Sequence, residues 1–203
     1  MKKEEKTELT KNKIYAAAIQ EFGTKGYVAG AINNICKSGI NKGLIYHNFK
    51  DKDDLYLACV QKSCDHLLLY VSGAMESVCF VEYMSARMRF FTEHEMEAAV
   101  FLEARTKPPK HLEKQISKAC SKFDELNKEV FEKELGCVEL RAGVSREDAL
   151  HYFFDVQKIY NFNFTKKFDS VTSPQDRIAL HEANIKKTFD LLLYGIAKGG
   201  RGS

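Results

Sequence analysis

Interruptions of helix formation are rare in this chain, and this constrains its fold more than any other feature. The 203 residues include only three prolines, and long stretches are rich in Lys, Glu, Leu and Ala, which favour helices. No pair of alternating β-branched runs flanks a tight Asn-Gly or Asp-Gly turn, the usual sign of a β-hairpin. Hydrophobic residues make up 44% of the sequence and charged residues 29%, a balance typical of globular proteins. We therefore predict an all-α fold.

Glycine and proline breaks divide the sequence into about nine predicted helices. Thr10 can cap the first helix, the Gly23–Gly26 segment ends it, and Pro108-Pro109 and Ser173-Pro174 mark later breaks. The predicted helices cover residues 10–22, 30–37, 42–49, 51–72, 79–92, 94–106, 109–135, 146–167 and 174–197.

Two of these helices are short, amphipathic and joined by a glycine turn. Ile32, Ile35 and Cys36 form the inward stripe of the first. Ile45 and Phe49 form an apolar pair one turn apart in the second. Gly39 lies between the two segments. This arrangement predicts a helix-turn-helix.

Positive charge is concentrated at the N-terminus. Up to Lys52 there are ten lysines and five acidic residues, a net charge of +5, which leaves −2 for the rest because the whole chain carries +3. Such a basic segment favours contact with a polyanion, since neutralising phosphates supplies much of the affinity for nucleic acids. A solvated lysine-rich face is an equally good interpretation of the charge taken alone.

The segment Lys42–Leu55 resembles the DNA-binding module of the TetR family of repressors. It contains that family's pattern Lys-Gly-x-x-Tyr-x-x-Phe followed by x-x-Lys-x-x-Leu. The segments Ala18–Tyr27 and Ile32–Lys37 are similar to the family's first two helices. The resemblance is specific over residues 10–60, and beyond them it extends to total length, helix count and the closing Leu-Leu-Leu-Tyr-Gly-Ile segment.

This resemblance implies a helix-turn-helix DNA-binding domain over residues 1–51 and a larger helical ligand-binding and dimerisation domain over residues 52–203. It also implies a homodimeric transcriptional regulator that binds a palindromic double-stranded operator. The expected activity is repression, relieved by a small apolar or amphipathic effector. The alternative is a helical ligand-binding protein that has lost specific DNA recognition.

The helix that begins at Asn41 carries the predicted DNA contacts. An α-helix fits the major groove, and its first turn faces the base edges. Lys42 is suited to a base or phosphate, Gly43 allows close approach, and Lys52 can hold a phosphate at the next helix start. Tyr46 as a structural residue and His47 as a surface bystander are alternatives. The predicted DNA-binding residues are Asn41, Lys42, Gly43, Leu44, Tyr46, His47, Asn48 and Lys52.

Two departures from the family pattern lie close to this helix. Gly30 and Ala31 occupy positions where the family usually has Thr or Ser for a phosphate. Between Lys37 and Gly39 there is one residue where the family typically has two. A one-residue deletion in a helix rotates all later residues of that helix by about 100°. Either the turn absorbs this change, or the sequence lacks a residue there, or the module binds DNA poorly.

Aromatic and methionine side chains between the two ends suit an adaptable apolar pocket. For each of them, a place in the helical core is the competing interpretation. The predicted ligand-binding residues are Met84, Met88, Phe91, Phe101, Phe123, Phe154 and Tyr160.

The family resemblance implies that the last two helices pair with their copies in a second subunit. Apolar residues at near-heptad spacing agree with this, although the same stripe is also suited to closing the chain's own core. The predicted interface residues are Ile178, Ile185, Phe189, Leu192, Leu193 and Ile196.

The remaining motifs favour no other class of protein. The sequence has no G-x-S-x-G, Walker loop, H-E-x-x-H or G-x-G-x-x-G, so we predict no enzyme and no cofactor. We expect no metal, because the spacing of the candidate ligands is not compelling. Those candidates are His94, Glu95, Glu97, His111 and His151.

The cysteines and the hydropathy pattern predict a reduced, cytoplasmic protein. The six cysteines form no C-x-x-C pair, and we expect most of them to be buried and reduced, with redox sensing as the alternative. No apolar run approaches the roughly 18 to 20 residues that span a bilayer. The N-terminus lacks the apolar stretch of a secretory signal, so we expect a cytoplasmic location and no membrane partner.

Overall fold

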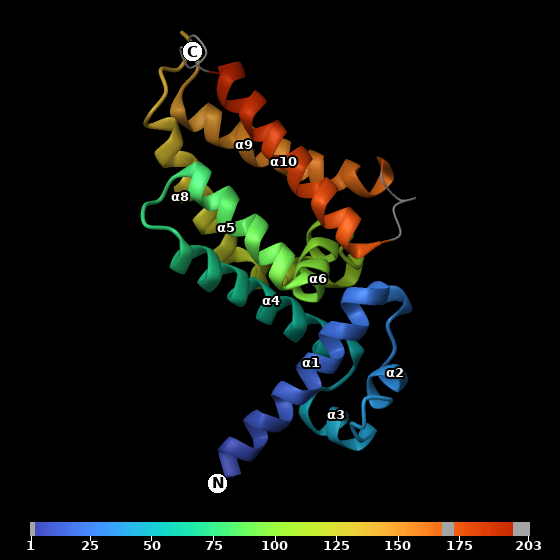
Figure 1. Cartoon of the computed structure of the whole chain (residues 1–203). Helices are drawn as coiled ribbons and strands as arrows, with labels where there is room; N and C mark the ends of the chain where they lie inside the picture. The colour runs from blue at the N-terminus through green and yellow to red at the C-terminus, as the bar shows by residue number, and fades with distance from the viewer. Residues whose placement is uncertain (1–2, 168–172, 197–203) are drawn as a thin grey trace. The chain divides into compact units, whose positions relative to one another are not determined.

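The computed structural model describes residues 3–167 and 173–196, and all regular secondary structure in these ranges is helical (Figure 1). The predicted all-α fold is confirmed. The helices are α1 (Lys3–Ala29), α2 (Ile32–Cys36), α3 (Lys42–Asn48), α4 (Lys52–Ala74), α5 (Phe80–Glu93), α6 (Glu95–Thr106), the 3₁₀ turn η1 (Lys110–Leu112), α7 (Glu113–Ala119), α8 (Ser121–Leu135), α9 (Arg146–Lys167) and α10 (Pro174–Ile196).

The described chain forms two compact units. The first contains the residues up to His66 together with His94–Cys120, and the second contains Leu67–Glu93 together with the residues from Ser121 onward. These units divide the chain differently from the predicted boundary between residues 51 and 52. Helices α6 and α7 belong to the first unit because α6 packs against α1. Helix α4 begins in the first unit and ends in the second.

The packing of α1 on α6 organises the first unit. A Cβ atom placed on Gly23 would lie 2.7 Å from the carbonyl oxygen of Met96, so the two helices approach each other more closely than a side chain would allow. At Gly26 the backbone takes φ +74 and ψ 174, which interrupts the helical path. Helix α1 also begins at Lys3 rather than at the predicted Thr10, because the Lys- and Glu-rich start is itself a good helix former.

The turn that joins α2 to α3 is the segment in which the sequence has one residue fewer than the family pattern. The amide of Ser38 donates to the carbonyl of Ile35 at 3.2 Å, and the amide of Gly39 donates to that of Cys36 at 3.1 Å. Gly39 has φ +87, a conformation that residues with a side chain rarely adopt. After this turn Ile45 of α3 and its C-cap residue Phe49 are both buried, so the helix packs on the unit with the turn as it stands.

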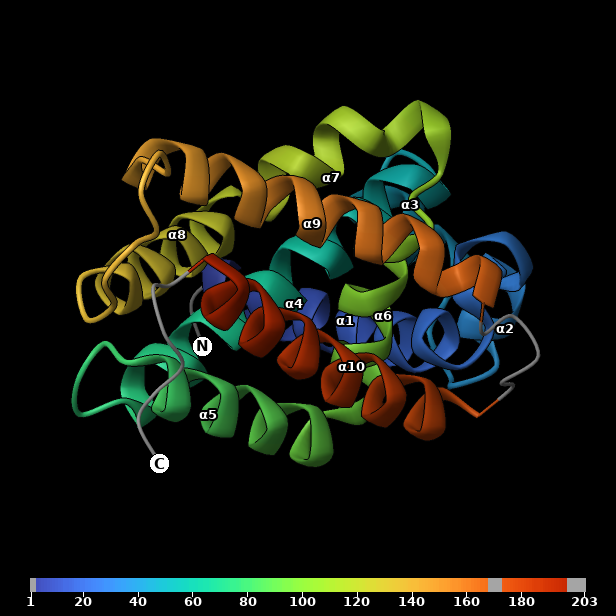
Figure 2. The ribbon, with the colours of Figure 1, turned by 90° about the horizontal axis from the view of Figure 1, so that it is seen from above.

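Aromatic stacking fills the second unit, which contains α5, α8, α9 and α10. Helix α10 packs along α9 and against α5 (Figure 2). The ring centroids of Phe131 and Phe153 are 3.8 Å apart, and those of Phe153 and Phe189 are 4.8 Å apart. Phe153 is therefore stacked between rings from α8 and α10, and this joins three helices.

A buried ion pair crosses this apolar interior. The guanidinium of Arg87 in α5 donates from Nε and Nη2 to the two carboxylate oxygens of Glu182 in α10, at 2.7 and 2.8 Å. Its Nη1 donates to the Tyr83 hydroxyl at 2.9 Å. His181 Nδ1 lies 2.9 Å from Glu182 Oε1. The pair is thus buried with hydrogen bonds to both of its members.

The pKa of Glu182 reflects these contacts. Burial by itself would raise the pKa, but the charge of Arg87 and the hydrogen bonds from His181 and Arg87 outweigh it and lower the pKa from 4.5 to about 2. Because folding lowers this pKa, the carboxylate stabilises the fold above the pKa of the unfolded chain. That contribution is lost as the pH falls from about 4.5 towards 2.

The other predicted elements agree closely with the structure, with one exception. The segment predicted as one helix over 109–135 is instead η1, α7 and α8, with a break at Cys120. Three of the six cysteines, Cys59, Cys64 and Cys120, are buried, whereas Cys36 and Cys79 are partly exposed and Cys137 is exposed. The expectation of burial therefore holds for half of them rather than for most. Within the part of the chain that the structure describes, no helix has both the length and the apolar character needed to cross a membrane.

Replacing Gly23 by Ala will lower the free energy of unfolding by about 1 to 3 kcal/mol, since the new methyl group must push α1 away from the α6 backbone. Urea denaturation measures this change. Gly73→Ala is the matched control, because nothing lies within 4 Å of a Cβ there, and it should be neutral or slightly stabilising. Equal effects of the two substitutions would contradict the close packing.

Glu182→Gln will destabilise the protein by about 3 to 5 kcal/mol at pH 7, because it leaves the buried charge of Arg87 uncompensated. The Arg87→Met, Glu182→Met double variant should lose much less. Acid unfolding monitored by circular dichroism adds a second measurement. The stability difference between the protein and Glu182→Gln should shrink as the pH falls below about 4.5, and a constant difference would exclude the ion pair as its source.

Candidate nucleic-acid interface

Helix α3 has one anchored face and one open face. Ile45 is 1% exposed and Phe49 is 5% exposed, whereas Leu44 and Tyr46 are 41% and 48% exposed. His47 is also exposed. The structure therefore brings the predicted DNA-binding residues of this helix together on its outer surface. The exposure of Tyr46 argues against a purely structural role for that side chain.

Two asparagine side chains form hydrogen bonds with the backbone of α3. Asn41 Oδ1 accepts a hydrogen bond from the backbone amide of Gly43 at 2.7 Å, as an N-cap. Asn48 Nδ2 donates to the Leu44 carbonyl at 2.8 Å. Asn41 thus fixes where α3 begins.

The two lysines predicted to contact DNA are held at the ends of neighbouring helices. Lys42 Nζ donates to Asn33 Oδ1 of α2 at 3.0 Å. Lys52 Nζ lies 4.5 Å from the centre of the Tyr27 ring and 3.4 Å from the Val28 carbonyl oxygen. These contacts tie the Lys42 ammonium to α2 and the Lys52 ammonium to α1.

Glu21 supplies the polar group that the start of α2 lacks. The backbone amide of Ala31 and the side-chain amide of Asn34 donate to Glu21 Oε1 at 3.2 and 2.8 Å. Burial opposes ionisation of Glu21, but hydrogen bonds from Asn34, Lys25 and the Ala31 backbone lower its pKa below the ordinary value. A carboxylate from α1 thus holds the start of α2.

Sequence reasoning missed a polar cluster behind these lysines. Tyr27 donates from its hydroxyl to Asp53 Oδ1 at 2.5 Å, and His111 Nε2 lies 2.8 Å from Asp53 Oδ2. The Tyr27 backbone amide donates to both carboxylate oxygens of Glu103, each at 2.9 Å. Tyr27 and Asp53 fall within the family-like segments. Nothing in the sequence connects them to Glu103 or His111.

The hydrogen bond between Tyr27 and Asp53 shifts the pKa of both groups. Burial, followed by the hydrogen bond to Asp53, raises the pKa of Tyr27 to about 12. The Tyr27 hydroxyl is the largest influence on Asp53 and lowers the pKa of its carboxyl group. Tyr27 is therefore neutral and Asp53 is charged near neutral pH. The negative charge of Asp53 partly balances the positive charge of the neighbouring Lys52.

The predicted ligand-binding residues are divided between the two units. Phe101 belongs to the first unit, whereas the other six belong to the second. Met84, Phe91 and Phe123 are buried, and Met88 is 38% exposed. Phe154 and Tyr160 are half-buried. The burial of Met84, Phe91 and Phe123 agrees with the competing core interpretation for these three residues.

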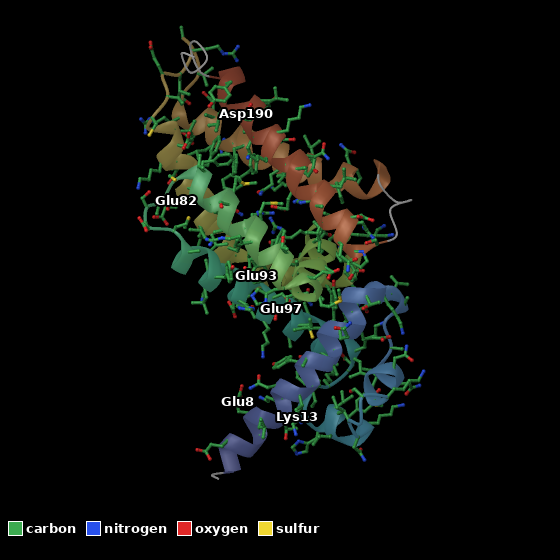
Figure 3. The ribbon with its side chains drawn as sticks, in the orientation of Figure 1. Glu8, Lys13, Glu82, Glu93, Glu97 and Asp190 are labelled. Carbon is green, nitrogen blue, oxygen red and sulfur yellow. The ribbon has the colours of Figure 1, made fainter. Side chains whose placement is uncertain are left out.

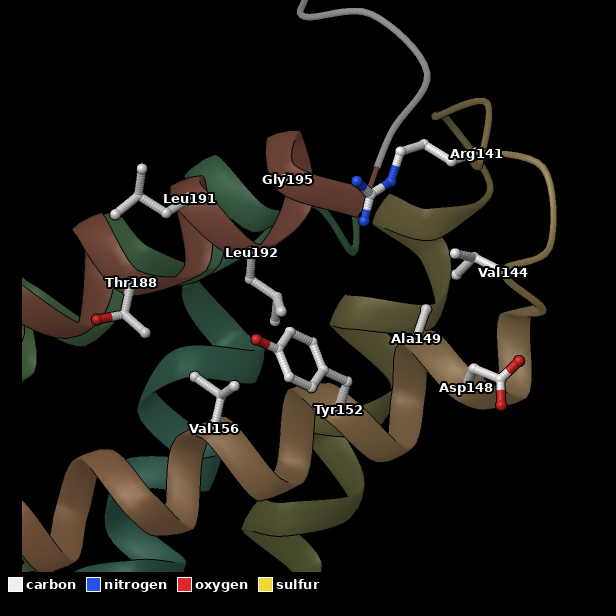
Figure 4. A pocket seen from close by; sticks show the side chains of 10 residues that line it. All are labelled: Arg141, Val144, Asp148, Ala149, Tyr152, Val156, Thr188, Leu191, Leu192 and Gly195. Carbon is white, nitrogen blue, oxygen red and sulfur yellow. The ribbon is translucent and has the colours of Figure 1, made fainter.

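A pocket of about 620 Å³ lies elsewhere in the second unit, on α9 and α10 (Figure 4). Tyr152 and Val156 of α9 and Leu192 of α10 line it, and Arg141 from the preceding loop stands at one end. None of the predicted ligand-binding residues takes part. This pocket combines an apolar wall with one cationic side chain, Arg141, and one anionic side chain, Asp148.

Five of the six residues predicted for the dimer interface lie inside the chain's own core. Ile178, Ile185, Phe189, Leu192 and Leu193 are each at most 5% exposed, as the competing interpretation of this stripe expects. The side chain of Ile196 lies outside the described residues. Other apolar side chains of α9 and α10 are exposed by 55 to 63%, namely Tyr152, Ile159, Phe162 and Leu191.

Comparison with known proteins agrees with this geometry. Residues 14–59, which contain α2, α3 and parts of α1 and α4, match the family model described as bacterial regulatory proteins, tetR family. This N-terminal segment is therefore similar to the corresponding part of that family. The chain is also similar to the HTH-type transcriptional regulator UidR of Escherichia coli, with 32% identity over 76 residues. That match covers 37% of this chain and 39% of UidR.

Solved structures extend the similarity to nearly the whole fold. The transcriptional regulator FadR from Bacillus subtilis, solved in complex with stearoyl-CoA, has a TM-score of 0.63 and 17% identity, over 91% of this chain and 98% of that one. The fatty acid degradation regulator FadR from Bacillus halodurans has a TM-score of 0.58 and 18% identity, with the same coverage. The TetR-type architecture of a helix-turn-helix followed by a larger helical domain is therefore confirmed.

Asn41→Ala will lower the free energy of unfolding by about 1 kcal/mol, because α3 loses its N-cap. Asn41→Asp should keep the stability, since aspartate caps helices equally well. Thermal and urea denaturation of both variants test this expectation. A stable Asn41→Ala variant would show that the cap does not hold α3.

Proposed function

We propose that this protein is a DNA-binding transcriptional regulator whose helix α3 enters the major groove. The observation that carries the proposal is the two-sided character of α3. Its inner side chains, Ile45 and Phe49, are buried, and Leu44, Tyr46 and His47 face outward with Lys42 at the first turn. An outward polar face at the start of a capped helix is suited to base edges and phosphates.

We infer that the regulator acts as a homodimer on a palindromic operator. The exposed apolar side chains on α9 and α10 support this, because large exposed apolar patches mark interaction surfaces. These residues replace the buried stripe that the sequence suggested for the interface. Two copies of α3 set about 34 to 36 Å apart would meet successive major-groove turns. The proposed location is the cytoplasm, where operator DNA is found.

Repression relieved by a small apolar or amphipathic effector is the proposed mode of action. The fold similarity to FadR from Bacillus subtilis, whose structure contains stearoyl-CoA, supports an effector of this class. The effector would favour a state with low operator affinity, so effector and operator would antagonise each other reciprocally. Helix α4 is the element proposed to couple the two events, because it begins at Lys52 and continues into the second unit.

The competing function is a helical ligand-binding protein without specific DNA recognition. The short turn before α3 is the reason to consider it. The structure favours the regulator instead, since α3 is capped, packed and outward-facing despite that turn.

Binding to DNA from upstream of the protein's own gene tests the proposal. Fluorescence anisotropy at several salt concentrations should show tighter binding to this DNA than to unrelated DNA. The Lys42→Ala, Lys52→Ala double variant should bind weakly and reduce the slope of log K against log salt by about two.

Lys118→Ala is the matched control, because Lys118 lies exposed on α7, and it should leave affinity and slope unchanged. Unchanged affinity in the double variant would remove both lysines from the interface. Equal binding of the wild-type protein to both DNAs would favour the ligand-binding alternative.

A further inference from the structure

Two imidazoles and one carboxylate meet in the first unit, away from the outer face of α3. His66 lies in α4, His94 directly precedes α6, and Glu97 is in the first turn of α6, where Figure 3 labels it. One ligand atom from each residue lies within 4.8 Å of the other two. His66 Nδ1 is 2.6 Å from Glu97 Oε2, and the centroids of the two imidazole rings are 4.5 Å apart.

The separations suit a small metal ion. Zinc binds imidazole nitrogen and carboxylate oxygen at about 2.0 to 2.1 Å, which places neighbouring donors of a tetrahedral site about 3.3 Å apart. The 2.6 Å contact would lengthen, and the wider separations, up to 4.8 Å, would shorten by small side-chain rotations.

The surroundings allow an ion to enter and leave. The side chain of His66 is 40% exposed and that of Glu97 is 21% exposed. A fully buried cluster would lack such access, and a fully exposed one would not be held in place. The partial exposure also leaves room for water as a fourth ligand.

We propose that His66, His94 and Glu97 form a binding site for a divalent transition metal of the zinc type. Two nitrogen donors and one oxygen donor match the preference of Zn²⁺, whereas Mg²⁺ and Ca²⁺ prefer oxygen donors throughout. In the bound form, coordinate bonds to His66 and Glu97 replace their mutual hydrogen bond. The ion joins α4 to the start of α6, inside the first unit.

The sequence alone pointed away from this site. His94 and Glu97 are close in the chain, but His66 precedes Glu97 by 31 positions and lies on another helix. Spacing rules detect ligands on one helix or one loop. They do not detect a third ligand supplied by tertiary packing.

Isothermal titration of the full-length protein with ZnCl₂ tests the proposal, after removal of any affinity tag. One Zn²⁺ should bind per chain at this site, and Mg²⁺ should give no comparable signal. His66→Ala, His94→Ala and Glu97→Gln should each weaken zinc binding at least about tenfold, since loss of even an outer partner of a metal ligand costs this much. Circular dichroism shows whether each variant is folded. If an alanine variant does not fold, Glu97→Gln still tests the site, because it keeps the shape of the side chain.

Two controls separate this site from other zinc ligands. His151→Ala removes an exposed histidine of the second unit and should leave zinc affinity unchanged. Cobalt substitution distinguishes the donors, because Co²⁺ bound to nitrogen and oxygen lacks the intense near-ultraviolet charge-transfer band that thiolate ligands produce.

Zinc should also raise the melting temperature of the wild-type protein and not that of the three ligand variants. Undiminished zinc binding in all three ligand variants, a thiolate band with cobalt, or the absence of zinc binding would each overturn the proposal. DNA affinity does not enter any of these measurements, so the outcome is independent of the proposed function.

Discussion

The first unit depends on the carboxylate of Glu103, which lies in α6 and binds the end of α1. It accepts the Tyr27 backbone amide on both oxygens and the Tyr56 hydroxyl at 3.2 Å. Gly26, with its positive φ, frees that amide from the helical hydrogen-bond pattern. An amide left unpaired there would carry a desolvation cost, so the carboxylate fixes the direction in which the chain leaves α1. That direction in turn sets the positions of α2 and α3.

The proposed DNA-binding surface of α3 is held in place by the packing of the opposite face of this helix. Ile45 and Phe49 hold α3 against the unit, and Asn41 fixes its first turn. The exposed side chains of the helix are therefore presented in one arrangement rather than as an ensemble. This preorganisation reduces the entropy lost on binding. It also explains why a short helix, marginal in isolation, is suited to contact a groove.

The second unit combines an aromatic core with a buried ion pair, and here the sequence was a weaker guide. The apolar stripe of α10 was consistent with a dimer interface or a monomer core, because both require the same periodicity. Burial of Ile185 and Phe189 assigns these side chains to the core. Arg87 and Glu182 gave no sequence signal, since their partnership joins α5 to α10 across 95 positions. Hydrogen bonds within such a pair depend on direction, so they restrict how α5 and α10 pack, whereas apolar contacts alone allow several arrangements.

The sequence by itself determined the all-α class, most helix boundaries, the glycine turn, the cap at Asn41 and the residues on the outer face of α3. These features depend on interactions within a few residues, where periodicity and capping act. Tertiary structure alone decided the assignment of α6 to the first unit, the Tyr27, Asp53 and His111 cluster, and the meeting of His66 with His94 and Glu97. Those contacts join residues far apart in the chain, and their free energy appears only once helices pack, so no local pattern records them.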